Sequence, residues 1–159
     1  MIIAISGTPG TGKTTVARLL GEKLGYRVIG LNDFAKKKKL FSGYDEKRDS
    51  YIVNVGKVRK ELRGVKARNL IIESHYAHDM DFDVLFILGV KPDELRKRGE
   101  EKGWRKEKTE ENVLVELMGV TEAEALDNRK VFHEIDTTRK KPAKVVSEIL
   151  KILKKYGYE

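Results

Sequence analysis

The sequence predicts an α/β fold: a parallel β-sheet covered by helices on both faces, in three layers. Short apolar runs rich in branched residues alternate along the chain with segments whose apolar residues recur at helical spacing. A glycine-rich loop lies between the first apolar run and the first helical segment, at an edge where α/β proteins bind ligands. A length of 159 residues is typical of one domain, so we expect a single domain over 1–159.

The apolar runs give the expected strands, and the periodic segments give the expected helices. Strands are expected at Met1–Ser6, Tyr26–Gly30, Asn69–Glu73, Phe82–Leu88 and Val131–Asp136. Helices are expected at Thr11–Leu24, Leu31–Leu40, Val53–Leu62, Pro92–Arg98, Thr109–Leu126 and Pro142–Tyr156. The polar segment Ser42–Ser50 is expected to be turn-like.

Residues at the helix ends support these boundaries. Gly25 follows the first helical segment, and glycine commonly ends a helix. Pro92 opens another, with Asp93 and Glu94 in the first turn, where carboxylates favour the helix dipole. Thr109 is a good starting residue for the helix that follows the charged segment 100–108.

The composition excludes several classes of protein. Cysteine is absent, which excludes disulfides, a thiol nucleophile and cysteine-bound zinc. No apolar run approaches the roughly 20 residues of a membrane span, so we expect no membrane contact and a cytoplasmic protein. The net charge of +8 favours anionic partners such as nucleotides, RNA or acidic protein segments. Charged residues make up 36% and Gln is absent, a composition typical of thermophiles.

The strongest motif is the phosphate-binding P-loop, G-x-x-x-x-G-K-[ST], matched by GTPGTGKT at residues 7–14. Its glycines let consecutive main-chain N–H groups point at phosphates, and the following helix adds its positive end. Lys13 is expected to contact the β- and γ-phosphates, and the Thr14 hydroxyl to bind Mg²⁺. The sequence has no N-K-x-D or D-x-x-G motif, so a GTP-dependent switch protein is excluded. A transport ATPase would be much longer. A small P-loop kinase, or an ATPase built on that frame, remains.

Two further segments fit phosphoryl transfer. Glu73 ends a strand where a P-loop protein needs a carboxylate near Mg²⁺. We interpret His75 as a contact to the nucleotide–Mg²⁺ assembly and His78 as an ordinary surface histidine. A metal site among these histidines, Asp79 and Asp81 stays open, although the residues lack the spacing of a zinc site.

Seven lysines and arginines gather within residues 96–108, interleaved with acids. Phosphoryl transfer spreads negative charge over the moving group, and mobile basic side chains stabilise that charge. This segment is therefore interpreted as a short lid that closes over the nucleotide, rather than as a solvated helix end.

The order of the motifs resembles one family over nearly the whole chain. The P-loop is followed by Asn32-Asp33-Phe34-Ala35-Lys36, Gly43-Tyr44-Asp45-Glu46, Glu73-Ser74-His75 and the segment from Arg98 to Trp104. In this the chain resembles archaeal members of the adenylate kinase isoenzyme 6 family. The resemblance implies a P-loop NTPase fold and a nucleotide kinase with ATPase activity that also acts in maturation of the small ribosomal subunit. It implies ATP, AMP or another nucleoside monophosphate (NMP), ribosomal protein uS11 and small-subunit precursors as partners, and Mg²⁺ as cofactor. Direct RNA contact stays open.

The resemblance also assigns residues. Residues about 30–53 would form the NMP-binding arm, in which Asp33 and Lys36 face the monophosphate, and residues about 101–111 the lid. Lys102 stands where an arginine is expected, so Arg98 or Arg105 would supply a bidentate phosphate contact. The expected catalytic residues are Lys13, Glu73, His75 and Arg98, and the expected metal ligands are Thr14 and Glu73. The expected nucleotide-binding residues are Gly10, Gly12, Lys13, Thr14, Thr15, Lys102, Arg105 and Lys141.

Three functions remain open at this point. The first is a broad-specificity NMP kinase of the adenylate kinase type. The second is a ribosome-assembly ATPase with little metabolic kinase activity. The sequence lacks the Asp-Gly-Phe-Pro-Arg loop of ordinary adenylate kinases, which is compatible with this second function. The third is a P-loop kinase of a non-nucleotide small molecule.

Overall fold

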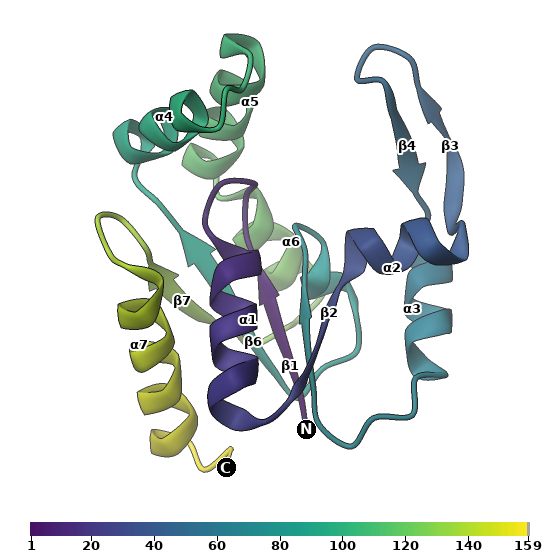
Figure 1. The fold of residues 1–159 in the computed structure, drawn as a ribbon, viewed down its shortest axis with the longest axis vertical. Helices are drawn as coiled ribbons and strands as arrows, with labels where there is room; N and C mark the ends of the chain where they lie inside the picture. Colours follow the sequence, from purple (N-terminus) through teal and green to yellow (C-terminus); the bar gives the residue numbers. More distant parts are fainter. Residues whose placement is uncertain (159) are drawn as a thin grey trace.

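A computed structural model describes residues 1–158, in which strands and helices alternate (Figure 1). The strands are β1 (Ile2–Ser6), β2 (Arg27–Gly30), β3 (Phe41–Asp45), β4 (Ser50–Val53), β5 (Leu70–Glu73), β6 (Val84–Gly89) and β7 (His133–Asp136). The helices are α1 (Lys13–Leu24), α2 (Leu31–Lys38), α3 (Val55–Arg63), the 3-10 helix η1 (Ala77–Asp79), α4 (Pro92–Glu101), α5 (Lys106–Leu117), α6 (Val120–Asp127) and α7 (Pro142–Lys155).

The main sheet has five strands in the order β2-β5-β1-β6-β7, and every neighbouring pair is parallel. This confirms the α/β fold and all five expected sheet strands. The register brings Gly30 and Ile5 level with Glu73, so the carboxyl ends of three strands meet there. Ligands bind at this edge of open parallel sheets.

Side-chain alternation in β1 divides the core into two layers. Ile3 and Ile5 point to the face covered by α1 and α7, where they join Leu20 and Ile149. Ala4 points to the opposite face, which α2, α3, η1 and α6 cover. Each fully buried Ile or Leu stabilises the fold by about 1.5–3 kcal/mol.

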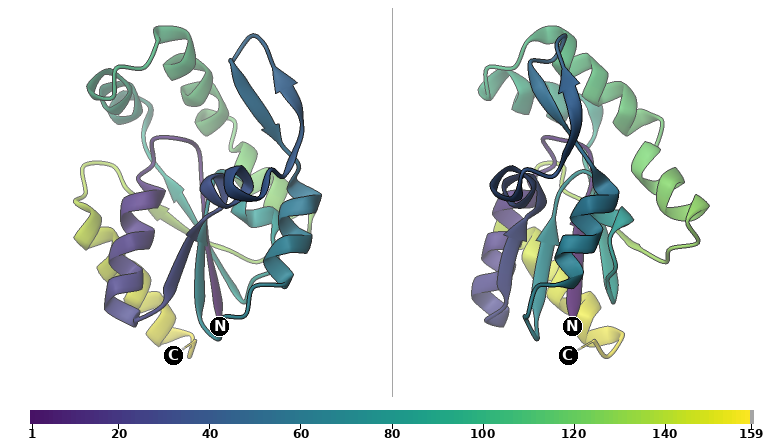
Figure 2. Two further views of the ribbon diagram at one scale, coloured as in Figure 1. Left: turned by 45° about the vertical axis from the view of Figure 1, so that its right-hand side comes forward. Right: turned by 90° about the vertical axis from the view of Figure 1, so that its right-hand side faces the viewer.

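Two projections rise above the carboxyl ends of the sheet strands. One is the antiparallel hairpin β3–β4, and the other is the pair α4–α5, as both views of Figure 2 show. They contact each other through Arg48 in the hairpin turn and Glu111 on α5, whose charged atoms lie 3.4 Å apart. Residues far apart in the sequence therefore meet above the phosphate-binding loop.

The structure corrects several expected boundaries. The segment Ser42–Ser50 is not simply a turn, because β3 and β4 pair there. Their aromatic side chains explain the pairing: the rings of Phe41 and Tyr51 stack at 4.6 Å, and Tyr44 meets Tyr51 edge-on at 5.2 Å. Val53 accordingly belongs to β4, and α3 begins only after Asn54, whose side chain accepts a hydrogen bond from the Lys57 N–H.

The helix expected at Thr109–Leu126 begins earlier and is broken. α5 starts at Lys106, and Gly119 separates it from α6 because its φ of 60° lies in the left-handed region. α4 runs on to Glu101, three residues beyond the expected end. α1 starts at Lys13 rather than Thr11, because Gly12 has a φ of 89°.

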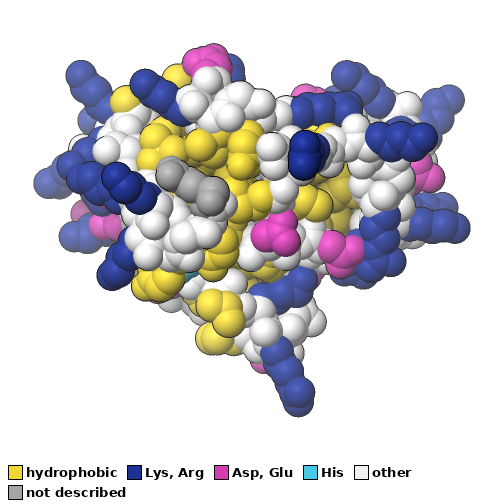
Figure 3. All heavy atoms as spheres, turned by 90° about the horizontal axis from the view of Figure 1, so that it is seen from below, with side chains coloured by type: hydrophobic (Ala, Val, Ile, Leu, Met, Phe, Trp, Pro, Cys, Tyr) yellow, Lys and Arg dark blue, Asp and Glu magenta, His cyan; other side chains and the backbone are white. Residues whose placement is uncertain are grey.

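The end of the molecule opposite the phosphate-binding loop carries both termini (Figure 1). Seen from that end, apolar side chains gather in the middle of the face and Lys and Arg side chains project around its rim (Figure 3). No helix within residues 1–158 combines the length and apolar character that a membrane crossing requires.

Candidate functional site

The loop between β1 and α1 is held in the conformation that its glycines allow. Gly7 has a φ of 144°, and a Cβ there would lie 2.5 Å from the carbonyl oxygen of Leu88. Gly10 has a φ of 92°, and a Cβ there would lie 2.8 Å from Leu95 and 3.0 Å from Trp104. Both positions need glycine, since a side chain would be strained and would clash.

Lys13 begins α1 and is buried, with only 8% of the residue exposed. Its Nζ donates a hydrogen bond of 3.0 Å to the Thr8 carbonyl oxygen, across the loop. Burial lowers the pKa of Lys13 to about 8, Lys102 adds to this, and the carboxylates of Glu73 and Glu116 oppose it. The side chain is thus a desolvated cation held at the loop, and no carboxylate of residues 1–158 forms an ion pair with it, which suits an anionic ligand.

Glu73 and Thr14 offer oxygen atoms beside this cation. The Thr14 hydroxyl donates a hydrogen bond of 3.2 Å to Glu73 Oε1. Burial raises the pKa of Glu73, while Lys13 and the Thr14 hydrogen bond act in the opposite direction. Gly30 packs closely here, since a Cβ would lie 3.0 Å from Glu73 Oε1. Carboxylate and hydroxyl oxygens are the hard ligands that Mg²⁺ prefers, so these two residues fit that ion.

A cavity of about 350 Å³ extends from the loop to the start of α2 on one side and to the segment between α4 and α5 on the other. It is lined by the loop and start of α1, by Asn32 and Asp33 at the start of α2, by residues 73–75, and by Lys102 and Trp104 after α4. Nine of the expected site residues line it: Gly10, Gly12, Lys13, Thr14, Thr15, Asp33, Glu73, His75 and Lys102. Lys36, Arg98, Arg105 and Lys141 are not among its lining residues.

Arg98 lies beside the loop and contacts main-chain oxygens. Its guanidinium donates hydrogen bonds of 3.1 Å to the Gly10 carbonyl and 2.9 Å to the Thr137 carbonyl. An ion pair of 3.5 Å with Glu94 holds it from the other side. In this arrangement Arg98 ties the phosphate-binding loop to the segment after β7.

Trp104 and Glu116 are site residues that the sequence reasoning did not single out. Trp104 lines the cavity, and the ammonium groups of Lys102 and Lys108 lie 5.3 and 4.5 Å from its ring centre. Glu116 on α5 accepts hydrogen bonds from the Thr8 hydroxyl at 2.6 Å and the Val90 N–H at 3.1 Å. The position of the single Trp within a basic segment could have identified Trp104 as a site residue from the sequence. Glu116 gave none, because its partners lie 108 and 26 residues away.

The two histidines of this region differ from each other. His75 lines the cavity, and burial, together with Lys13, lowers its pKa. The interpretation of His78 as a surface histidine is wrong: the residue is 1% exposed. Its Nδ1 lies 2.7 Å from Ser6 Oγ and its Nε2 lies 2.6 Å from Glu124 Oε2. It is buried because η1 turns the chain inward under α6, which local sequence patterns do not reveal.

The chain is similar to known proteins over nearly its whole length. A family model described as an AAA domain matches residues 3–119. A protein of Pyrococcus furiosus named "Putative adenylate kinase" is 44% identical over 158 residues, covering 96% of this chain and 84% of that protein. One of the same name from Thermococcus kodakarensis is 38% identical, covering 98% and 86%. The fold is similar to shikimate kinase of Acinetobacter baumannii solved with shikimate, with a TM-score of 0.69, 19% identity and coverage of 99% and 95%.

Proposed function

Because the chain belongs to the AAA-domain family and is related to the archaeal proteins named "Putative adenylate kinase", we propose that it transfers the γ-phosphoryl group of ATP to AMP or a related NMP. These relatives alone indicate that the protein is a P-loop phosphotransferase. The observation that supports phosphoryl transfer to AMP or a related NMP is the cavity, whose lining combines Lys13 and Glu73 with the start of α2 and with the segment between α4 and α5. One side of that cavity suits the donor phosphates and the other suits an acceptor.

The donor side is formed by the phosphate-binding loop and its neighbours. The main-chain N–H groups of the loop and the Lys13 ammonium bind and orient the phosphates of ATP. Thr14 and Glu73 would hold Mg²⁺, which neutralises negative charge on the phosphate oxygens when bound. Lys102 and Trp104 cover the cavity from the segment 101–111, which we propose as the lid.

The acceptor side is formed by the start of α2. Asn32 and Asp33 line the cavity there, and the hairpin β3–β4 follows directly along the chain. We propose residues about 30–53 as the NMP-binding arm of a single domain, with Asp33 facing the monophosphate. Lys36 lies on the next turn of the same helix and is exposed, so it can reach the acceptor only if the arm moves inward.

The test is the direct assay of ADP formed from ATP, AMP and Mg²⁺. The purified protein should form ADP, and Lys13→Ala should abolish it, because the loop then loses its cation. Lys23→Ala is the matched control, since Lys23 is an exposed lysine in the last turn of the same helix. No ADP above the Lys13→Ala background would reject the proposal. Turnover of a sugar or shikimate-type acceptor in preference to NMPs would indicate a kinase of a non-nucleotide small molecule instead.

A second role, ATP hydrolysis coupled to small-subunit maturation, is supported by the surface. Leu114 and Leu117 on α5 and Met118 directly after it are 57%, 64% and 68% exposed, and their spacing of three and four residues places them on one side of this helix end, which suits a protein partner. The net charge of +8 suits partners on or near RNA. By the family resemblance that partner would be uS11. Failure of a lysate pull-down to recover uS11 or small-subunit precursors, with or without ATP, would exclude this role and leave the kinase proposal standing.

A further inference from the structure

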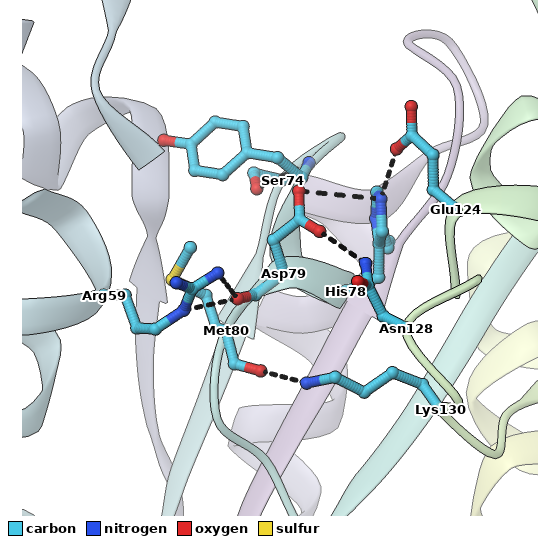
Figure 4. Close-up of polar contacts among 10 residues, drawn as sticks. Arg59, Ser74, His78, Asp79, Met80, Glu124, Asn128 and Lys130 are labelled. Atoms are coloured by element: carbon cyan, nitrogen blue, oxygen red, sulfur yellow. Dashed lines mark hydrogen bonds and ion pairs between the residues drawn. The ribbon is translucent and has the colours of Figure 1, made fainter. Parts of the chain in front are cut away.

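A second cluster of ligand-type side chains lies on the opposite face of the sheet from α1. It comprises His78 and Asp79 of η1 and Glu124 of α6, whose ligand atoms lie within 4.8 Å of one another. In Figure 4 both carboxylates point at the same imidazole edge. We propose that these three residues form a binding site for a divalent transition-metal ion such as Zn²⁺, separate from the Mg²⁺ expected at Thr14 and Glu73.

The distances from the imidazole nitrogen to the two carboxylate oxygens differ by less than about 1 Å from those expected around one bound ion. His78 Nε2 lies 2.6 Å from Glu124 Oε2 and 3.9 Å from Asp79 Oδ2. Ligand atoms around a tetrahedral Zn²⁺ lie about 3.4 Å apart, because each bond is about 2.0–2.2 Å long. Glu124 would therefore move outward and Asp79 inward, each by less than about 1 Å. The Glu124 side chain is 52% exposed, so it has room to do so, and water can complete the coordination.

The surroundings hold the three ligands in place. Ser6 Oγ lies 2.7 Å from His78 Nδ1, so it can accept a hydrogen bond from Nδ1–H, and in that tautomer the Nε2 lone pair faces the carboxylates. Asn128 Nδ2 donates a long hydrogen bond of 3.5 Å to Asp79 Oδ1. Two neighbouring cations bind main-chain oxygens rather than these carboxylates: Arg59 donates to the Asp79 carbonyl and Lys130 to the Met80 carbonyl. The contact between Ser6 and His78 Nδ1 is of the kind that metal-binding histidines usually make with the ring nitrogen that does not bind the ion.

Charge balance also favours a cation. A neutral imidazole carries a single N–H, and when that proton is on Nε2 it can be donated to only one of the two carboxylates. Among residues 1–158, neither carboxylate forms an ion pair with a lysine or an arginine, and their shared partner is His78. A dication would neutralise both carboxylates together. One nitrogen and two oxygen ligands suit Zn²⁺, Co²⁺ or Mn²⁺, whereas Mg²⁺ prefers oxygen ligands alone.

The ion would fasten α6 and η1 to the end of β1. Ser6, which contacts His78, directly precedes the phosphate-binding loop. Binding at this place should therefore stabilise the folded protein in the absence of nucleotide, because the ligands converge only in the folded state.

The experiment uses the full chain, stripped of metal with EDTA and free of nucleotide. Calorimetric titration with Zn²⁺ should show one tight site, and Zn²⁺ should raise Tm while Mg²⁺ at the same concentration does not. Glu124→Gln and Asp79→Asn should each weaken Zn²⁺ binding at least about tenfold, and His78→Asn should remove it. Co²⁺ should give a visible absorption band that Zn²⁺ displaces.

Matched variants separate this site from adventitious binding. The chain has three histidines, so His75→Asn and His133→Asn should keep the tight site. Asp127→Asn is the control for an exposed carboxylate on the same helix. Because Glu124 is half-exposed, replacing it leaves no buried cavity, so the variant should fold. Circular dichroism checks that it does. Absence of a tight site in the wild-type chain, equal Zn²⁺ affinity in Glu124→Gln, or loss of the site in His75→Asn would each overturn the proposal.

Discussion

If Lys13 binds the phosphates as proposed, nucleotide binding should depend on pH above neutrality. Its pKa is lowered from 10.5 to about 8, mainly by burial, and only the protonated ammonium attracts phosphate. Below pH 8 the free protein carries this charge, so the affinity for ATP should be nearly constant. Above pH 8 the free protein loses the charge, and the affinity should fall by up to about tenfold per pH unit.

Calorimetry of ATP binding between pH 7 and 9.5 measures this dependence. Near pH 8.5 in two buffers of different ionisation enthalpy, binding should take up protons, because bound phosphates raise the pKa of Lys13. An affinity that stays constant to pH 9.5 would contradict the assignment of Lys13 as the phosphate-binding cation.

Gly10 should tolerate no side chain. Gly10→Ala would place a methyl group 2.8 Å from Leu95 and 3.0 Å from Trp104 in a left-handed conformation. We expect a loss of about 1–3 kcal/mol in the free energy of unfolding, together with weaker ATP binding. Gly43→Ala is the control, since its added Cβ would meet nothing closer than 3.8 Å. Urea unfolding of both variants measures the difference, and equal midpoints would refute the expectation.

At the scale of elements, Glu116 connects α5 to the phosphate-binding loop. Glu116→Gln replaces one carboxylate oxygen by an NH₂ group, so either the Thr8 hydroxyl or the Val90 N–H loses its acceptor. We expect the free energy of unfolding to fall by about 1–3 kcal/mol and KM for ATP to rise. Glu111→Gln, on the exposed side of the same helix, should leave KM for ATP within about twofold, because surface pairs contribute little. Equal KM values in both variants would show that Glu116 does not position the loop.

Sequence patterns predicted the elements that local chemistry determines. The five strands of the main sheet, α1 with its glycine loop and α7 were found because their apolar periodicity and end residues are local signals. The hairpin β3–β4 was missed because cross-strand pairs such as Tyr44 with Tyr51 stabilise it, and its polar residues resemble a loop. The same distinction applies to the site: Lys13 and Glu73 follow from local motifs, whereas Glu116 and the burial of His78 depend on contacts between distant elements.

The whole chain should be thermostable. Charged residues make up 36% of it and Gln is absent, and ion pairs such as Arg63 with Asp81 and Arg96 with Glu110 connect separate elements. The free-energy cost of desolvating charges falls as temperature rises, so such ion pairs stabilise the fold more at high temperature. We expect Tm above about 65 °C, the upper range of mesophile domains. Differential scanning calorimetry at low and high salt measures it, and a midpoint near 50 °C would contradict the interpretation.

Trp104 gives the molecule an intrinsic optical probe. The chain contains a single tryptophan, and its ring lies at the cavity between two ammonium groups and beside Gly10. Indole emission responds to nearby charge and to solvent, and no other residue of this chain contributes an indole signal. Nucleotide arrival and any motion of the proposed lid should therefore be measurable by stopped-flow fluorescence on the unmodified protein, without a dye.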